Sequence, residues 1–280
     1  MSWRFARRPS WVLRHLLVVA MVVVMVNLGF WQLRRLDEKR DLNARVDARQ
    51  AQPVEPVAEI VDPGAAVDDP EVVRAEHRTA SARGTYLPDS VVVVNRSYNG
   101  AAGGWVLTPL DLGDGTAVVV NRGFIGFDRS GDLVAPDPPR GTVEVTGLVR
   151  LTQRRGSIGP TDPAEGVLSQ LARADLERYQ RQVEVDLLPV YLQLVTSDPA
   201  EVTAGDGPVL VPLDPPEPGE GPHLGYALQW FTFSTIAVVG YPLILRRVAQ
   251  QEARERRRAE AAGGPGDADR TPDELARSGS

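Results

Sequence analysis

Few side chains in this sequence could do redox, nucleophilic or metal chemistry, and their scarcity narrows the range of functions. There are no cysteines, a single lysine (Lys39) and only three histidines, His15, His77 and His223. The lack of cysteine excludes disulfides, thiolate metal sites, CxxCH haem attachment and cysteine nucleophiles. The histidines cannot supply a catalytic triad or a three-histidine metal site, and GxSxG, P-loop, HExxH and GxGxxG motifs are missing. The sequence therefore favours a protein that is not an enzyme.

The distribution of charge points to a membrane rather than to a nucleic acid. Residues 51–222 contain 26 acidic side chains and 13 arginines, a net charge of −13, while arginines cluster near both ends of the chain. Binding of nucleic-acid phosphates needs clustered positive charge, so we expect no nucleic-acid partner. The basic ends are better explained by the surface of a lipid bilayer.

Two uncharged runs predict two transmembrane helices. Residues 16–33 (LLVVAMVVVMVNLGFWQL) and residues 224–245 (LGYALQWFTFSTIAVVGYPLIL) contain no charged side chain. At about 1.5 Å per residue they reach about 27 Å and 33 Å, enough to cross a hydrocarbon core. For the first run the alternative is a cleaved signal peptide, but no small-x-small cleavage site follows it.

The flanking arginines predict how the chain is oriented. Arginines precede the first span and follow the second, and the positive-inside rule then places both termini in the cytoplasm. The predicted parts are a basic N-terminus (1–15), a first span (16–33), an extracytoplasmic domain (34–222), a second span (223–245) and a cytoplasmic tail (246–280). We expect residues 34–50 to continue the first helix, the prolines at 53–70 to mark a linker, residues 197–222 to run extended into the second span, and residues 259–280 to be disordered.

The segment between the spans is rich in predicted strands. β-branched and aromatic runs lie at residues 91–94, 105–110, 116–120, 142–150 and 188–195, and Asp114-Gly115 is a good hairpin turn. The apolar spacing of residues 166–180 predicts a helix. The fold class is therefore a two-span membrane protein with an antiparallel, mainly-β (α+β) extracytoplasmic domain inserted between two transmembrane helices.

One short motif occurs twice within the predicted strands. Residues 91–100 (VVVVNRSYNG) resemble residues 117–126 (AVVVNRGFIG), so that Arg96 corresponds to Arg122. The simpler interpretation is two similar exits from strand to turn in one antiparallel sheet. A paired functional use of the two arginines stays open.

Several blocks of the sequence resemble the Surfeit locus protein 1 family. They follow the order of that family and together cover about residues 16–250. The blocks are LGFWQLRRLDEK (28–39), GTYL (84–87), GWVLTPL (104–110), VVVNRGF (118–124), GTVEVTG (141–147) and PHLGYALQWF (222–231). The chain departs from the family at residues 221–222, where many members have asparagines, and at Phe124, where tryptophan is common.

The resemblance implies a bacterial cell-membrane assembly factor for haem–copper cytochrome c oxidase that assists insertion of haem a into the catalytic subunit. The implied partners are that subunit, the lipid bilayer and the haem a synthesis machinery, and the implied cofactor is transiently held haem a. Two alternatives are a cofactor-free membrane-tethered scaffold for another complex, and a membrane hydrolase, which would need clustered aspartate and serine residues in a deep pocket.

With the resemblance in hand, the outer ends of the two spans become the candidate site. Packed as an antiparallel pair, the spans place His223 level with residues 30–35, where its imidazole could ligate haem iron. Trp31 and Trp230 could flank the ring, and Arg34 and Arg35 could pair with its propionates. The plainer interpretations are a polar anchor for His223 and lipid-headgroup contacts for the two arginines.

Overall fold

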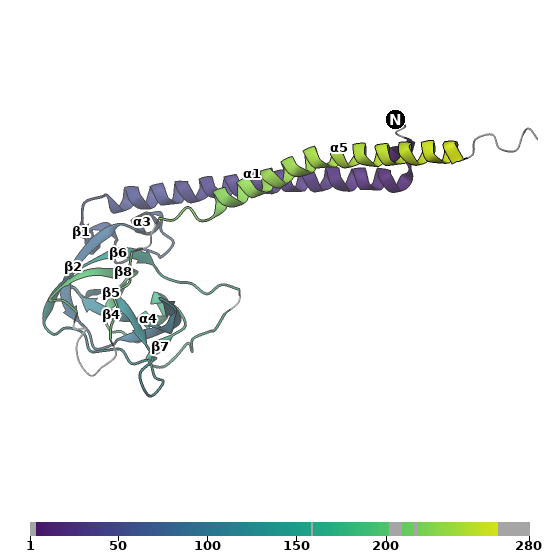
Figure 1. The fold of residues 1–280 in the computed structure, drawn as a ribbon. Helices are drawn as coiled ribbons and strands as arrows, with labels where there is room; N and C mark the ends of the chain where they lie inside the picture. Colours follow the sequence, from purple (N-terminus) through teal and green to yellow (C-terminus); the bar gives the residue numbers. More distant parts are fainter. Residues whose placement is uncertain (1–3, 158, 202–208, 216–217, 263–280) are drawn as a thin grey trace, which may run out of the picture. The chain divides into compact units, whose positions relative to one another are not determined.

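A computed structural model of the chain describes residues 4–157, 159–201, 209–215 and 218–262 (Figure 1). The chain divides into two units: residues 1–40 with 219–280, and residues 41–218. The helices are η1 (Arg4–Arg7), α1 (Pro9–Gln50), α2 (Val57–Ile60), α3 (Pro70–Ala75), α4 (Leu176–Gln180) and α5 (His223–Ala262). The strands are β1 (Glu55–Pro56), β2 (Thr79–Tyr86), β3 (Val91–Tyr98), β4 (Ala101–Asp111), β5 (Thr116–Gly126), β6 (Thr142–Leu151), β7 (Gln170–Leu171) and β8 (Asp186–Asp198).

The first unit is a pair of long antiparallel helices, α5 and most of α1. Both helices are long and apolar enough to cross a membrane. The predicted continuation of the first helix through residues 34–50 is confirmed, because α1 runs unbroken to Gln50. The tail predicted to be disordered lies mostly outside the described residues, although α5 itself extends to Ala262.

The second unit is built on one sheet of eight strands in the order β1-β2-β6-β8-β5-β4-β3-β7. An additional pairing of β2 with β4 closes strands β2, β6, β8, β5 and β4 into a ring. The predicted β4–β5 hairpin is confirmed: Leu112 N donates to Thr116 O at 3.0 Å, and Gly115 has the positive φ that such a turn requires.

The sheet is mixed, so the prediction of an antiparallel sheet is only partly right. β5 runs parallel to β8, and the short strands β1 and β7 run parallel to β2 and β3. Parallel neighbours need a long crossover, and the chain from β5 to β8 passes through β6, β7 and α4. Strand runs locate strands in the sequence, but they do not say which strand pairs with which.

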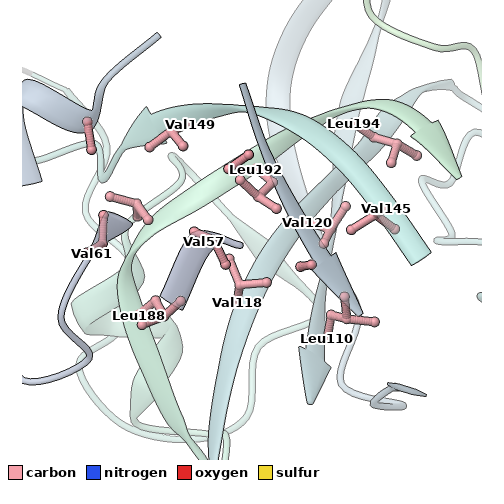
Figure 2. Close-up of a cluster of buried hydrophobic side chains, with 14 of the residues drawn as sticks. Val57, Val61, Leu110, Val118, Val120, Val145, Val149, Leu188, Leu192 and Leu194 are labelled. Atoms are coloured by element: carbon pink, nitrogen blue, oxygen red, sulfur yellow. The ribbon is translucent and has the colours of Figure 1, made fainter. Parts of the chain in front are cut away.

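The core lies on both faces of the central strands. Val118 and Val120 of β5 and Leu192 of β8 point into one buried cluster, which Figure 2 shows, whereas Val119 and Tyr191 belong to a second cluster on the opposite face. A strand that is buried on both faces reads as a continuous apolar run, which explains why β5 and β8 were predictable.

Two local predictions for this unit are wrong. The proline-rich residues 53–70 are not a linker, because Val57 and Val61 are buried in the first cluster together with Val72. In residues 166–180 only Leu176–Gln180 is helical, with Asp175 as its N-cap, while Leu171 packs in an extended strand beside β3. Leu171 and Leu176 are both buried, the first from a strand and the second from a helix. Their apolar spacing therefore looks helical in the sequence although only the second residue is in a helix.

The segment before the second predicted span is described only in part. Residues 202–208 and 216–217 lie outside the described residues, so the prediction of an extended course can be followed only around them. In the described part, Val211 forms an antiparallel bridge with Phe124, and Leu210 is buried.

Candidate functional site

The helix pair is held together by contacts along its length. At Gly29 an added Cβ would lie 2.8 Å from ring carbons of Phe231, so glycine lets this ring pack against the α1 backbone. Phe30 meets the same ring edge to face, with centroids 5.4 Å apart. The small side chain of Ala227 is also buried. These contacts fix the register of α1 against α5.

That register brings His223 to Gln32. The Nδ1 atom of His223 lies 2.9 Å from Oε1 of Gln32, and both side chains are half-buried. Because an amide oxygen only accepts hydrogen bonds, Nδ1 is the donor in this contact, and in the neutral tautomer that it favours the lone pair is on Nε2. The expectation that His223 lies level with residues 30–35 is therefore met, and the partner that orients it is a residue that the sequence did not single out.

A second contact joins α1 to the residues just before α5. The guanidinium of Arg40 donates two hydrogen bonds to the carboxylate of Glu220, at 2.8 Å and 3.0 Å. The hydrogen bond from Arg40 lowers the pKa of Glu220, and Glu220 raises the pKa of Arg40. Both groups are solvent-exposed, so this fork serves to orient the start of α5 more than to stabilise it.

The other four predicted site residues differ in their exposure and in their contacts. Trp31 follows Phe30 on α1 and is exposed, whereas Trp230 is half-buried and lies two helical turns along α5 from His223, about 10 Å. Arg35 is engaged by Glu38 at 2.6 Å. Within the described residues Arg34 has no ion-pair partner and is exposed, which leaves it the freer of the two arginines.

The opposite end of the pair holds a similar contact. Nδ1 of His15 lies 2.6 Å from the hydroxyl of Tyr241, and its Nε2 lies 3.2 Å from the carbonyl oxygen of Ala6. Both ring nitrogens of His15 are thus engaged. At His223 only Nδ1 has a hydrogen-bond partner within the described residues.

Among its described residues the β-sheet unit contains one buried ion pair. Arg122 and Glu201 have side chains only 1% and 9% exposed, and they are joined by two hydrogen bonds of 2.7 Å and 3.0 Å. Arg122 also donates to the carbonyl oxygens of Pro136 and Asp137 and lies 5.6 Å from the centre of the Tyr86 ring. One arginine therefore ties β5 to two segments that follow it in the sequence.

The repeated Asn-Arg motif marks two irregularities of the sheet. β3 and β5 flank β4, and the pairing with β4 shifts register just before Arg96 in β3 and at Arg122 in β5. The motif therefore lies at bulges inside the strands and not at their exits into turns. The two bulges differ in backbone, since Asn95 has a positive φ in the first and Gly123 in the second.

A cavity of about 510 Å³ lies beside the bend between β2 and β3. Its lining includes Tyr86, Ser90, Asp137 and Ser169. The lining brings one aspartate and two serines to the same cavity, as the hydrolase alternative would need, but Ser90 is hydrogen-bonded to Thr108 at 2.9 Å, and within the described residues no hydrogen bond joins Asp137 to either serine. The arrangement gives no support to a catalytic site.

Sequence reasoning singled out His223 and Arg122 but missed the residues that pair with them. Gln32, Glu201 and Glu220 each pair with a residue far away in the chain, and each looks like an ordinary polar residue. Only Gln32 had a local signal, because it is a polar side chain inside an otherwise apolar run.

Comparison with known proteins places these features in a family context. The family model described as the SURF1 family matches residues 19–235. A SURF1-like protein of Mycobacterium tuberculosis is 30% identical over 267 residues, which cover 94% of this chain and 92% of the relative. SURF1-like proteins of Rickettsia felis and Monosiga brevicollis are 23% and 25% identical, over 84% and 82% of this chain and 97% and 87% of the relatives.

Proposed function

Because the chain belongs to the SURF1 family, we propose that it is an assembly factor for haem–copper cytochrome c oxidase that assists insertion of haem a into the catalytic subunit. The family is linked to cytochrome oxidase assembly. Haem a is cargo in this proposal, and the protein performs no catalytic step of its own. The partners are the oxidase catalytic subunit and, at the point where the cargo is received, the haem a synthesis machinery.

The proposal includes a position in the membrane. The two apolar helices cross the bacterial cell membrane, both termini lie in the cytoplasm, and the β-sheet unit lies outside. The arginines at the two ends of the chain support this orientation. Reporter fusions after Asp137 and at Ser280 test it: the first reads as external and the second as cytoplasmic, and a cytoplasmic reading at Asp137 would overturn it.

The observation that carries the haem proposal is the hydrogen bond between His223 and Gln32. A histidine that binds a metal through one ring nitrogen is commonly oriented by a hydrogen bond from the other nitrogen. With Nδ1 held by Gln32, Nε2 is the atom available to an iron. Among the described residues no three histidine, aspartate or glutamate side chains gather as a metal site, but haem needs only one axial ligand from the protein.

The two tryptophans and two arginines near His223 are not equally suited to contact haem. Trp31 is exposed at the same level of α1 and can contact an apolar ring, and Trp230 can do so from further along α5. Arg34 is free to pair with a propionate. Arg35 would first have to leave Glu38, so its contribution is the smaller one.

A single half-buried histidine also suits the transfer of cargo. A carrier must release haem to the oxidase, and a ligand of moderate strength releases more readily than two ligands enclosing the iron. His223, at the first position of α5 and beside Pro222, lies at the end of the helix pair and not in its middle.

The test is the visible spectrum of the detergent-purified protein from a host that makes haem a. We expect haem in the wild type, loss of haem in His223→Ala and reduced haem in Gln32→Ala, because the imidazole is then no longer oriented. His15→Ala is the matched control, since it removes a histidine that also bonds across the helix pair, and it should retain haem.

Two outcomes would contradict parts of the proposal. If His223→Ala binds as much haem as the wild type, the assignment of the ligand is wrong. If the wild type carries no haem but co-purifies with the oxidase catalytic subunit, the protein is a cofactor-free scaffold and the cargo proposal fails. Haem content of the oxidase in a strain with His223→Ala separates the two roles.

A further inference from the structure

The two Asn-Arg bulges place equivalent arginines in different electrostatic surroundings. Arg122 is paired inside the molecule by the carboxylate of Glu201, which accepts two hydrogen bonds. Its counterpart Arg96 has no carboxylate partner anywhere in the described residues. The sheet therefore presents the same element twice, once with its counter-ion and once without.

The surroundings of Arg96 keep its guanidinium in place but do not neutralise it. The group stacks over the Trp105 ring, 4.3 Å from its centre, and its Nη2 donates to Oε1 of Gln153 at 2.8 Å. Nε is buried without a hydrogen-bond partner, and Nη1 has none among the residues described. The side chain is thus oriented by an aromatic ring and an amide, with donors still unused.

Two side chains act electrostatically on Arg96: the Tyr191 phenol, which favours its charge, and the cation Arg173, which opposes it. Arg150 lies directly across from Tyr191 in the β6–β8 pairing, and its Nη1 lies 3.1 Å from Nδ1 of His77. Arg96 and Arg150 both interact electrostatically with the Tyr191 phenol, and Arg173 interacts in the same way with Arg96. Burial lowers the pKa of the Arg96 guanidinium, with Arg173 acting in the same direction. Arginines therefore outnumber carboxylates in this region of a unit that is acidic overall, and Glu76, which lies 3.8 Å from His77, is paired there and not with Arg96.

A half-buried cation beside other cations is costly unless an anion pairs with it. Guanidinium groups pair best with carboxylates, through parallel hydrogen bonds. We propose that Arg96, supported by Trp105 and Arg150, is a docking site for a carboxylate carried by an extended acidic segment of a partner protein.

The edge of β3 favours a polypeptide over a small acid. β7 pairs with β3 only at Val92 and Val93, so in the described structure the outer edge of β3 beyond the bulge, from Arg96 to Tyr98, has no neighbouring strand. An exposed edge of this kind accepts an added strand through backbone hydrogen bonds. A strand at this edge would run beside Arg96. This inference does not depend on haem a or on His223.

Binding to the full-length protein in detergent tests the proposal. The probe is a fluorescein-labelled octapeptide that alternates glutamate and valine, and its partner probe has glutamine in place of glutamate. By fluorescence anisotropy at low salt, the wild type should bind the glutamate peptide and not the glutamine peptide. Arg96→Gln should weaken binding at least tenfold, whereas Arg129→Gln, which removes an exposed arginine elsewhere in the unit, should change it less than twofold.

The outcomes separate a docking role from a structural one. Because Arg96 lacks an internal counter-ion, Arg96→Gln should leave the unfolding midpoint unchanged or raised, while Trp105→Leu should weaken peptide binding by removing the stacking surface. The proposal is overturned if the wild type fails to bind the glutamate peptide, or if Arg96→Gln and Arg129→Gln bind it equally well. It is also overturned if glutarate competes at concentrations as low as the peptide itself, which would indicate a site for small acids.

Discussion

Removing Arg122 should destabilise the β-sheet unit more than removing any exposed arginine. The guanidinium is almost fully buried and makes four hydrogen bonds, two to Glu201 and one each to the carbonyl oxygens of Pro136 and Asp137. The variant Arg122→Met keeps much of the side-chain length and removes the charge and all four hydrogen bonds.

The expected loss follows from what the variant leaves behind. Breaking a buried ion pair by removing one partner costs about 3–5 kcal/mol, because the other charge stays buried. The two carbonyl oxygens lose their donor, but Asp137 is exposed and can bind water. Only the half-buried carbonyl of Pro136 adds a cost, about 1 kcal/mol. The total is about 4–6 kcal/mol, a large part of the stability of an ordinary domain.

Urea unfolding of the full-length protein in detergent measures this loss. Trp105 is the sole tryptophan in residues 41–218, and the other four belong to the helix-pair unit, so the fluorescence change that is absent from a Trp105→Phe version of the protein reports on the β-sheet unit. With a slope of about 2 kcal/mol per M of urea, the midpoint should fall by about 2–3 M. Arg129→Gln is the control and should move it very little, since Arg129 is exposed.

The double variant decides whether the reasoning is right. Arg122→Met combined with Glu201→Met removes both charges, so most of the penalty should disappear and the cost should return to about 1–2 kcal/mol. A double variant as unstable as Arg122→Met alone would show that hydrogen bonds or packing, and not the unpaired charge, dominate at this site.

Three further predictions concern other parts of the chain. Gly29→Leu should lower the thermal midpoint of the detergent-solubilised protein by an overpacking cost of about 1–3 kcal/mol, because its Cβ would press on Phe231, whereas Gly225→Leu, at an open position, should not. Burial lowers the pKa of His77, so the unfolded chain binds a proton at this histidine more readily than the folded chain does. The free energy of unfolding should therefore fall as pH drops below about 6.5. His77→Asn should flatten this part of a stability profile measured from about pH 7.5 to 5, and an unchanged slope would contradict the assignment. Asp175→Ala should cost about 1 kcal/mol by urea unfolding, because it removes the N-cap of α4, and no loss would mean that the cap contributes nothing.

Local patterns determined much of the architecture. An uncharged, mainly apolar run of 18 residues or more has no charged group to keep it in water, so both apolar helices were readable from composition. β5 and β8 were readable because both of their faces are buried. β2 was missed, since its buried positions are mainly the small residues Ala80 and Ala82 and its outward positions are polar.

The pairing of strands and of charged groups was decided only by the tertiary structure. Nothing local distinguishes β5 beside β8 in parallel from an antiparallel arrangement, because the same alternation serves both. The two Asn-Arg motifs look alike in the sequence. What separates them is Glu201, 79 residues from Arg122, which chain folding brings to one arginine and not to Arg96.

The same division holds at the candidate site. The sequence by itself determined that His223 is the one histidine at the end of the second apolar run, and that an antiparallel pair would bring it level with residues 30–35. It did not determine that Gln32 would accept from Nδ1, because that contact joins residues 191 positions apart and depends on the register set by Gly29 and Phe231. Composition fixes which segments are buried, since burial follows from each segment's own side chains, whereas a hydrogen bond between two helices requires side chains to meet within about 3 Å, and only their packing decides that.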